Sequence, residues 1–218
     1  MTTRTRRLAV ALAAAAVLPL ALTACSDDSG DSGASDTSAK ASASSGSDDM
    51  GGSGSSASAM DQPFGAACSA VPKNGAGSFD GMAQDPVATA ASHNPVLSTL
   101  VTAVKKAGLV DTLNNAQDIT VFAPTDDAFA KIPKATLDKV LGDKAELTKI
   151  LTYHVVGKRL APKDLMKGSY ETLEKSRLTT AGSGETYTVD GSAKVVCGNV
   201  RTANATVYIV DTVLMPKS

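Results

Sequence analysis

The most informative stretch of this 218-residue chain is TVFAPTDDAFA, which spans residues 120–130. Its first residues are apolar and β-branched or aromatic, as in a buried strand, and Pro124 ends that strand because proline lacks the N–H that a sheet needs. Thr125 or Asp126 can then cap a following helix. Asp126 and Asp127 resemble a catalytic carboxylate pair, but their place at a helix start favours a capping role. The stretch therefore predicts a strand, a turn and a helix start in succession.

Two further strings follow it, LTYHVV at residues 151–156 and ANATVYIVDTVLMP at residues 203–216. The first closes a pattern of apolar residues at helical spacing. The second is rich in Val and Ile, and its residues 206–215 predict a mostly buried strand.

Helical patterns dominate the first half of the region around these strings, and short strands dominate the second. Apolar side chains recur at helical spacing over residues 95–104, and Gly108 follows as a stop signal. Later, short β-type runs alternate with turn signals, GSG at residues 182–184 and DG at residues 190–191. Helices followed by strands are typical of the α+β class.

Together, in this order and spacing, the three strings resemble the signature blocks of the fasciclin (FAS1) domain, over about residues 83–216. The resemblance implies a single fasciclin domain, with helices packed on a sandwich or wedge of short strands and a disordered tether before it. The stretches GMAQDPVATAASHNP (residues 81–95) and VVCGNVRTANATVY (residues 195–208) are similar to the mycobacterial immunogenic secreted and surface-lipoprotein members of that family. This similarity implies an actinobacterial cell-surface lipoprotein.

Residues 1–24 have the pattern of a secretory signal peptide. Three arginines and no acidic residue precede an apolar run that ends at Ala24, and LTAC at residues 22–25 resembles a bacterial lipobox. The lipobox implies that Cys25 is lipidated, with acyl chains such as palmitate, and becomes the mature N-terminus. A transmembrane anchor and an ordinary cleaved signal are the alternatives, and the Ala-rich run is short for a permanent span. Export by the general or the twin-arginine route stays open.

The next segment has the composition of a disordered chain. Residues 26–61 contain 13 Ser, 6 Gly, 7 Asp and one Lys, with a net charge of −6. Such a segment cannot bury enough apolar surface to offset its chain entropy, and a flexible chain of this length spans roughly 30–36 Å. We therefore expect a tether at residues 25–61, an N-terminal arm at residues 62–82 and the fasciclin domain at residues 83–218.

Two cysteines remain beyond the tether, Cys68 and Cys197. Export places them in an oxidising compartment, so a disulfide between them is expected. It would close a loop of about 130 residues, contribute up to about 5 kcal/mol by the loop-entropy model and fasten the arm to the body. A redox-active pair is disfavoured because the two lack the close spacing of a CxxC motif.

Composition and motifs argue against several classes of protein. The chain has a net charge of −1, two histidines, three cysteines, no Trp and 4% aromatic residues. These values disfavour a nucleic-acid binder and a zinc site. The sequence contains no GxSxG elbow, HExxH helix or phosphate-binding loop. We expect no catalytic residues, no metal and no cofactor.

The resemblance also suggests candidate binding residues. In animal fasciclin proteins a Tyr-His region and an Asp-Ile motif are linked to integrin-mediated adhesion. Tyr153 and His154 match the first, whereas Asn199 and Val200 occupy the place of the second without its acidic residue. Integrin recognition of the animal type is therefore not expected. From its position, the favoured interpretation of His154 is a partly buried imidazole bonded to backbone or to a side chain.

The expected function is that of a non-enzymatic cell-surface lipoprotein whose fasciclin domain mediates adhesion. Its partner would be a cell-surface or matrix protein or a cell-wall component. Lipid on Cys25 would hold the protein to the outer face of the cytoplasmic membrane at the cell surface, and secretion of part of it stays open. The alternative is an extracytoplasmic carrier or sensor of a small hydrophobic ligand, held in a cleft between helices and sheet. The oligomeric state stays open.

Overall fold

The computed structural model describes residues 62–216 of the chain. The signal peptide, the lipidation site Cys25 and the tether at residues 25–61 lie outside these residues. They stay predictions.

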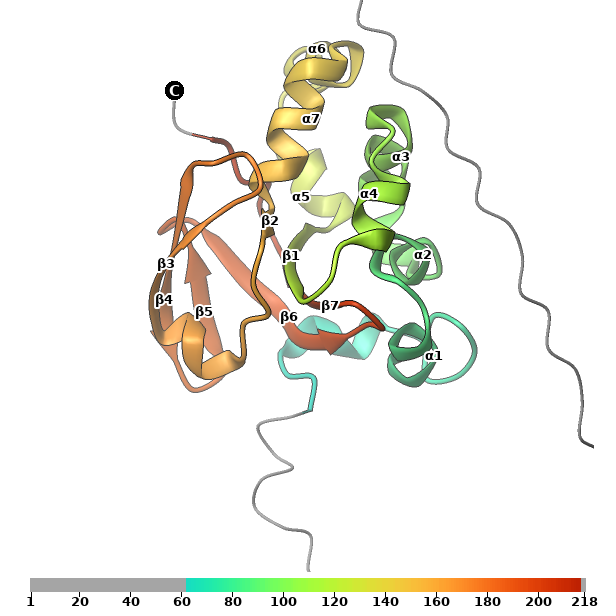
Figure 1. Ribbon diagram of the computed structural model, residues 1–218, viewed down its shortest axis with the longest axis vertical. Coiled ribbons are helices and arrows are strands. Elements are labelled where there is room, and N and C mark those ends of the chain that lie inside the picture. Colours follow the sequence, from blue (N-terminus) through green and yellow to red (C-terminus); the bar gives the residue numbers. More distant parts are fainter. Residues whose placement is uncertain (1–61, 217–218) are drawn as a thin grey trace, which may run out of the picture. The chain divides into compact units, whose positions relative to one another are not determined.

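Helices occupy most of the first half of the described chain, and strands most of the second (Figure 1). The helical segments are η2 (Ala66–Ala70), α1 (Phe79–Gln84), α2 (Val87–Ser92), η3 (Pro95–Leu97), α3 (Ser98–Ala107), α4 (Val110–Asn115), α5 (Asp126–Ala130), α6 (Lys134–Gly142), α7 (Lys144–Tyr153) and η4 (Pro162–Met166). The strands are β1 (Ile119–Pro124), β2 (Val155–Val156), β3 (Lys167–Glu171), β4 (Arg177–Ser183), β5 (Thr186–Val189), β6 (Ala193–Arg201) and β7 (Ala205–Val210). The expected α+β class is confirmed.

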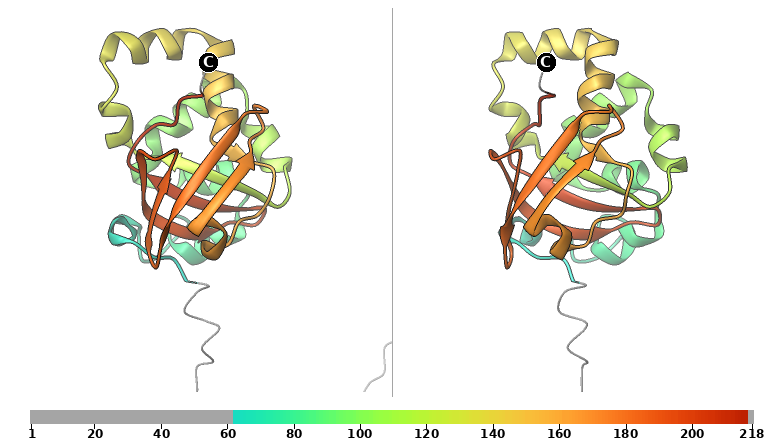
Figure 2. Two further views of the ribbon diagram at one scale, coloured as in Figure 1. Left: turned by 90° about the vertical axis from the view of Figure 1, so that its left-hand side faces the viewer. Right: turned by 60° about the vertical axis from the view of Figure 1, so that its left-hand side comes forward.

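The seven strands form one mixed sheet in the order β2-β1-β7-β6-β5-β4-β3. Strands β1 and β7 are parallel, and the other neighbouring strands are antiparallel. The two edges of the sheet meet, because Val156 in β2 bridges to Thr172, just after β3, and Leu173 N donates to Val155 O at 2.8 Å. The sheet is thus curled almost into a closed barrel, and Figure 2 shows the strands on one side and most of the helices on the other.

Strands β1 and β7 are buried on both faces, which explains why both are mostly apolar, with one buried threonine each. Val121 and Ile209 belong to the core beneath the helices. Phe122 and Tyr208 belong to a second core inside the curled sheet, where their ring centroids lie 5.8 Å apart. The central strand pair therefore joins the two cores.

Local capping explains several helix boundaries. The Thr125 side chain accepts from Ala128 N at the start of α5, and the Asp143 side chain accepts from the first amides of α7. Asp126 instead binds the first turn of α3, accepting from Thr99 N and Ser98 Oγ at 2.7 Å each. Burial acts to raise the pKa of Asp126, but these hydrogen bonds outweigh it and lower the pKa. The expected capping role is thus shared, with Thr125 capping its own helix and Asp126 a neighbouring one.

The last strand is shorter than the sequence predicts, since β7 ends at Val210 and not at residue 215. Asp211 turns the chain out of the sheet by accepting from Lys194 N at 2.8 Å and from Lys131 Nζ at 3.2 Å.

Near the N-terminal end of the described chain, the expected boundary between arm and domain at residue 82 falls within α1. This helix contacts α2 and β6.

Candidate functional site

The N-terminal arm is fixed to the sheet covalently. A disulfide joins Cys68 to Cys197 in β6, with Cα atoms 4.9 Å apart and a sequence separation of 129. Just before it, Phe64 N donates to Gly198 O at 3.1 Å and Gly198 N donates to Phe64 O at 2.7 Å. The expected disulfide is present, and the arm adds a short antiparallel bridge beside it.

Side-chain packing holds the same arm. The ring of Phe64 meets Tyr187 edge-on, with centroids 5.5 Å apart. The ring also covers Gly198, where an added Cβ would lie 2.4 Å from it. Glycine at this position therefore lets an aromatic side chain lie directly on the backbone of β6.

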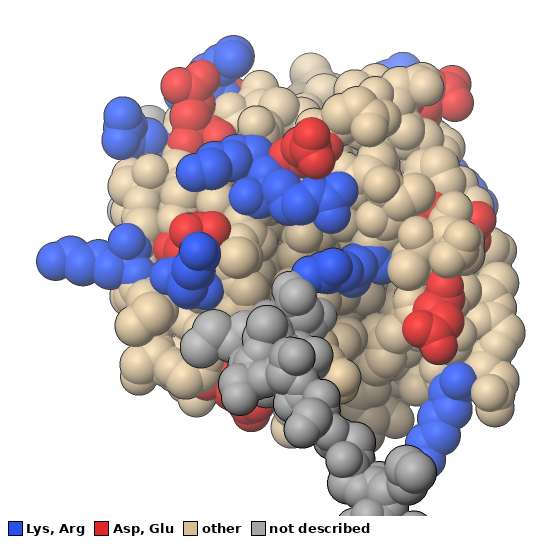
Figure 3. Space-filling model, turned by 60° about the horizontal axis from the view of Figure 1, so that its bottom comes forward, with Lys and Arg blue, Asp and Glu red and all other residues tan. Residues whose placement is uncertain are grey.

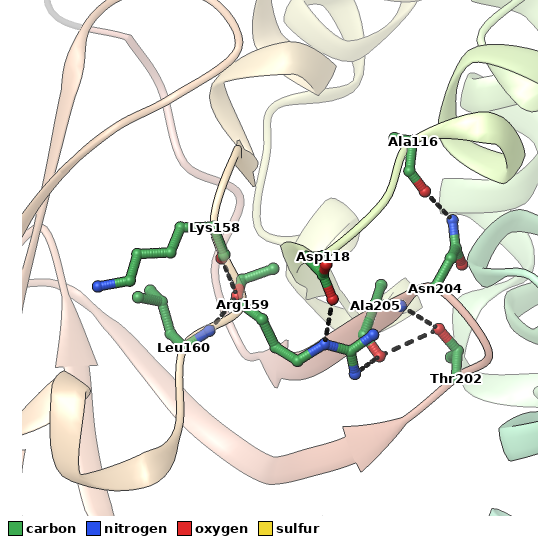
Figure 4. Close-up of polar contacts among 9 residues, drawn as sticks. Ala116, Asp118, Lys158, Arg159, Leu160, Thr202, Asn204 and Ala205 are labelled. Carbon is green, nitrogen blue, oxygen red and sulfur yellow. Dashed lines mark hydrogen bonds and ion pairs between the residues drawn. The ribbon is translucent and has the colours of Figure 1, made fainter.

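Asn204, in the loop between β6 and β7, anchors the helices to the sheet. Its Oδ1 accepts from Val87 N at the start of α2 at 2.8 Å. Its Nδ2 lies 2.8 Å from Leu113 O, in α4. The same nitrogen lies 2.7 Å from Ala116 O, just after α4 (Figure 4). One buried amide thus sets the position of two helices relative to the sheet.

Polar contacts next to Asn204 close the same end of the sheet (Figure 4). Arg159 Nε lies 3.3 Å from Asp118 Oδ1, and its Nη1 donates to Ala205 O at 3.3 Å. The Thr120 hydroxyl donates to Lys158 O at 2.7 Å. These bonds hold the segment after β2 against β1 and β7.

An apolar cavity of about 170 Å³ lies between the helices and the sheet. Helices α2, α3 and α4 form its outer wall, with Ala90, Leu100 and Leu113 among the lining residues, and β1 and β7 form its floor with Val121 and Val207. Ser92 and Lys105, which are both exposed, also line it. The two helices that Asn204 positions are therefore two of the three that cover this cavity.

A comparison with protein families supports the resemblance of the three sequence strings to the fasciclin signature blocks. The family model for the fasciclin domain matches residues 95–216, more than half of the chain. The chain belongs to the fasciclin family. The match includes all strands of the described sheet and begins at η3, so the arm and the first two helices precede it.

Two known mycobacterial proteins are similar to this chain over about 150 residues, and a solved insect structure has a similar fold. The immunogenic protein MPB70 of Mycobacterium bovis is 48% identical over 156 residues, which are 69% of this chain and 79% of that protein. The cell surface glycolipoprotein MPB83 of M. bovis is 51% identical over 147 residues, 65% of this chain and 66% of that protein. A FAS1 domain pair from the insect cell adhesion molecule fasciclin I has a similar fold, with a TM-score of 0.51, 21% identity and coverage of 62% of this chain and 52% of that one.

Tyr153 and His154 lie inside the fasciclin domain, with 1% and 2% of their surface exposed. Tyr153 OH donates to Asp190 Oδ2 at 2.8 Å, and burial together with this carboxylate raises the pKa of the phenol. His154 Nδ1 lies 2.8 Å from Ile150 O, and its Nε2 accepts from Leu214 N at 3.0 Å. His154 is more deeply buried than the partly buried imidazole expected, but its ring is bonded to backbone as expected. Through these bonds Tyr153 and His154 hold helix, hairpin and C-terminal segment together.

The other two candidate binding residues are also buried. Asn199 is 4% exposed, has a φ of 56° in the bulged part of β6 and donates to Gln62 O at 3.3 Å. Val200 is 2% exposed, pairs with Val207 and lines the cavity. A large partner cannot reach these four side chains without rearrangement, and their binding role stays a prediction.

The sequence analysis did not identify Asn204 as a site residue. Its contacts lie about 90 to 120 residues away in the chain and give no local signal.

The described part of the chain offers no metal centre and no membrane span. Residues 62–216 contain no group of three or more His, Cys, Asp or Glu side chains that could hold a metal ion. Within that range, every helix is too short or too polar to cross a bilayer.

Proposed function

We propose that this protein is a cell-surface lipoprotein whose fasciclin domain mediates adhesion without enzymatic chemistry. The observation that carries the proposal is the 48–51% identity to an immunogenic protein and a cell surface glycolipoprotein over the fasciclin domain. The insect protein that shares the fold is named a cell adhesion molecule. Lipid on Cys25 would anchor the chain to the outer face of the cytoplasmic membrane, and residues 25–61 would extend the domain toward a partner.

The exposed surface is suited to a mixed polar contact. On the face shown in Figure 3, basic and acidic side chains are interspersed over a largely uncharged surface. Such a surface favours a protein or cell-wall partner over a polyanion, which selects a continuous basic stripe.

Multivalent binding tests the adhesion proposal. Beads coated with the oxidised protein are incubated with the organism's own cells, with cell-wall fractions and with matrix proteins, because weak single contacts gain avidity when they are presented together. Saturable retention that is lost when the protein on the beads is unfolded supports adhesion. No retention on any of these surfaces, with folding verified, contradicts it.

A second candidate function is that of a carrier or sensor of a small hydrophobic molecule, and the apolar cavity favours it. Native mass spectrometry of protein purified from its own host should then detect a bound small molecule. Val110→Phe should reduce its occupancy, because Val110 is a partly exposed cavity-lining residue of α4 where a larger ring obstructs the space. Protein that carries no ligand from its host counts against this function.

A further inference from the structure

We infer that the cavity beneath α2, α3 and α4 binds a monocarboxylate, with its apolar tail inside the cavity and its carboxylate at the mouth, beside the ammonium group of Lys105. This inference rests on the second proposed function, the binding of a small hydrophobic molecule. It adds the chemical class of the ligand, its orientation and the residue that selects its charge.

The size of the cavity limits the tail of the ligand. Its volume of about 170 Å³ is close to the roughly 150 Å³ of an engineered apolar cavity that binds benzene. An apolar body of about six to ten non-hydrogen atoms therefore fits, whereas the two long chains of a membrane lipid do not. The cavity is thus suited to a single short tail.

The interior of the cavity offers no partner to a polar head group. Most lining residues are Ala, Val, Leu or Ile. Both ring nitrogens of His154 are bonded to backbone, and Thr202 Oγ1 both donates to Ala205 O and accepts from Ala205 N. Asn94 Nδ2 has no partner within residues 62–216, but protein atoms cover it, so it is not open to the cavity. A head group placed inside would lose its hydration without compensation, and the interior therefore accepts the tail.

The mouth of the cavity lies between α2, α3 and α4, where lining residues reach the surface. Ser92 and Lys105 are exposed there, and Val101 and Val110 are partly exposed. Lys105 is the one lining residue with a formal charge, since His154 is buried as the neutral ring. A lysine beside an apolar wall lays its methylene groups on that wall and keeps its ammonium group in water. The polar end of a bound ligand would therefore meet a cation.

The ammonium group of Lys105 has no partner in the described part of the chain. None of the ion pairs or side-chain hydrogen bonds within residues 62–216 includes it. A carboxylate at the mouth gains this cation as a partner and keeps much of its hydration, because the mouth faces solvent. Charge complementarity thus favours an acid over a neutral molecule of equal size.

Octanoate and methyl octanoate test the inference on the purified full chain, produced with Cys25→Ser so that it carries no covalent lipid. The two probes share one tail, but octanoate alone is charged, and the ester represents an acyl chain that belongs to a lipid. Binding is followed by chemical-shift titration of backbone amides, and both probes should shift the amides of α2, α3 and α4. Val110→Phe, which obstructs the mouth, should weaken both probes.

Substitution of Lys105 tests the role of its charge. Lys105→Met removes the charge and keeps an unbranched side chain. It should lower the ratio of the octanoate affinity to the methyl octanoate affinity about threefold to fivefold, the upper part of the range for a solvent-exposed ion pair. Lys105→Arg keeps the charge, so this ratio should stay within about twofold of the wild-type ratio.

Lys106→Met is the matched control. Lys106 is the next residue in the last turn of α3 and is also exposed, but it does not line the cavity. This variant makes the same change in net charge and should leave the ratio of the two affinities unchanged.

A series of saturated acids tests the placement of the tail. The affinity of the wild type should rise about fourfold for each CH₂ group added from hexanoate to decanoate, as expected for a buried methylene group. It should then level off at dodecanoate and tetradecanoate, because the cavity is full. An affinity that keeps rising to tetradecanoate would place the tail outside the cavity and overturn the inference.

The other outcomes separate the inference from the function on which it rests. If both probes bind but Lys105→Met changes the affinity ratio no more than Lys106→Met, the inference is overturned and the hydrophobic-ligand function stands. If the wild type binds methyl octanoate and not octanoate, the cavity takes an uncharged acyl chain, and the inference is likewise overturned. If neither probe binds, or if Val110→Phe weakens neither, both fail.

Discussion

Protonation of His154 should make the stability of the fasciclin domain fall in mild acid. The ring is 2% exposed, with Ile150 O 2.8 Å from Nδ1 and Leu214 N 3.0 Å from Nε2. Because a carbonyl only accepts and an amide N–H only donates, the ring is held as the neutral tautomer with its proton on Nδ1. Burial lowers its pKa from 6.5 to about 4, against the smaller opposing effect of the Ile150 carbonyl.

The sign and size of the effect follow from these two pKa values. The unfolded chain takes up a proton on this ring as the pH falls through 6.5, whereas the folded protein does so only near pH 4. The stability that depends on the neutral ring is therefore complete above pH 6.5 and is lost as the pH falls toward 4. The expected loss is about 2 kcal/mol at pH 5 and about 3 kcal/mol at pH 4.

Urea denaturation between pH 7.5 and 4.5 measures this loss. His154→Gln should be less stable than the wild type at pH 7.5 by about 1–3 kcal/mol, because a buried backbone group loses its partner. Its stability should then be nearly flat with pH, so that the two curves converge near pH 5. His93→Gln, which replaces the other histidine of the chain, should keep most of the wild-type slope.

Two outcomes would refute the reasoning: a wild-type stability that does not change over this range, or a His154→Gln variant with the wild-type slope. Asp126 and Asp211, two partly buried carboxylates, do not produce the same loss in this pH range. Hydrogen bonds outweigh the effect of burial and lower the pKa of Asp126 and of Asp211 from 3.8, so their contribution is lost only below this range.

Three further predictions concern the arm and the helices. Reduction of the disulfide should lower the free energy of unfolding by up to about 5 kcal/mol and expose the arm to limited proteolysis; equal midpoints in urea with and without reductant would contradict this. Gly198→Ala should destabilise the domain in thermal melts by displacing Phe64, whereas Gly142→Ala, where an added Cβ meets nothing within 4 Å, should be neutral or slightly stabilising. Asn204→Ala should cost about 2–4 kcal/mol and raise hydrogen exchange in α2 and α4 first; uniform acceleration over the whole domain would count against its role as their anchor.

Much of the fold was predictable because its signals are local. The strand and turn of residues 119–124, the Asp143 cap and the β4–β5 and β5–β6 turns each depend on a few neighbouring residues. The disulfide was predictable for another reason, since only two cysteines follow the tether.

The organisation of the site was not predictable in the same way. The parallel pairing of β1 with β7 joins residues more than 80 apart in the chain, and no local pattern specifies it. The contacts of Asn204 and the unsatisfied amide of Asn94 likewise depend on which distant segments meet. Asn94 followed by Pro95 is typical of a helix start, and Asn94 does cap η3, but this local pattern gives no sign that its side chain lines a cavity.

The link between Cys68 and Cys197 also sets how the protein responds to mechanical load. A pull on the two ends of the described chain passes from residue 68 through the sulfur atoms into β6, so the segment between the cysteines is shielded from it. Only residues 62–68 and 197–216 can then be drawn out, roughly 95 Å of extended chain, compared with roughly 540 Å for residues 62–216 without the bond. Under shear, the domain would therefore release only a limited length of chain, with helices α2, α3 and α4 outside the path of the force while β7, in the cavity floor, stays within it.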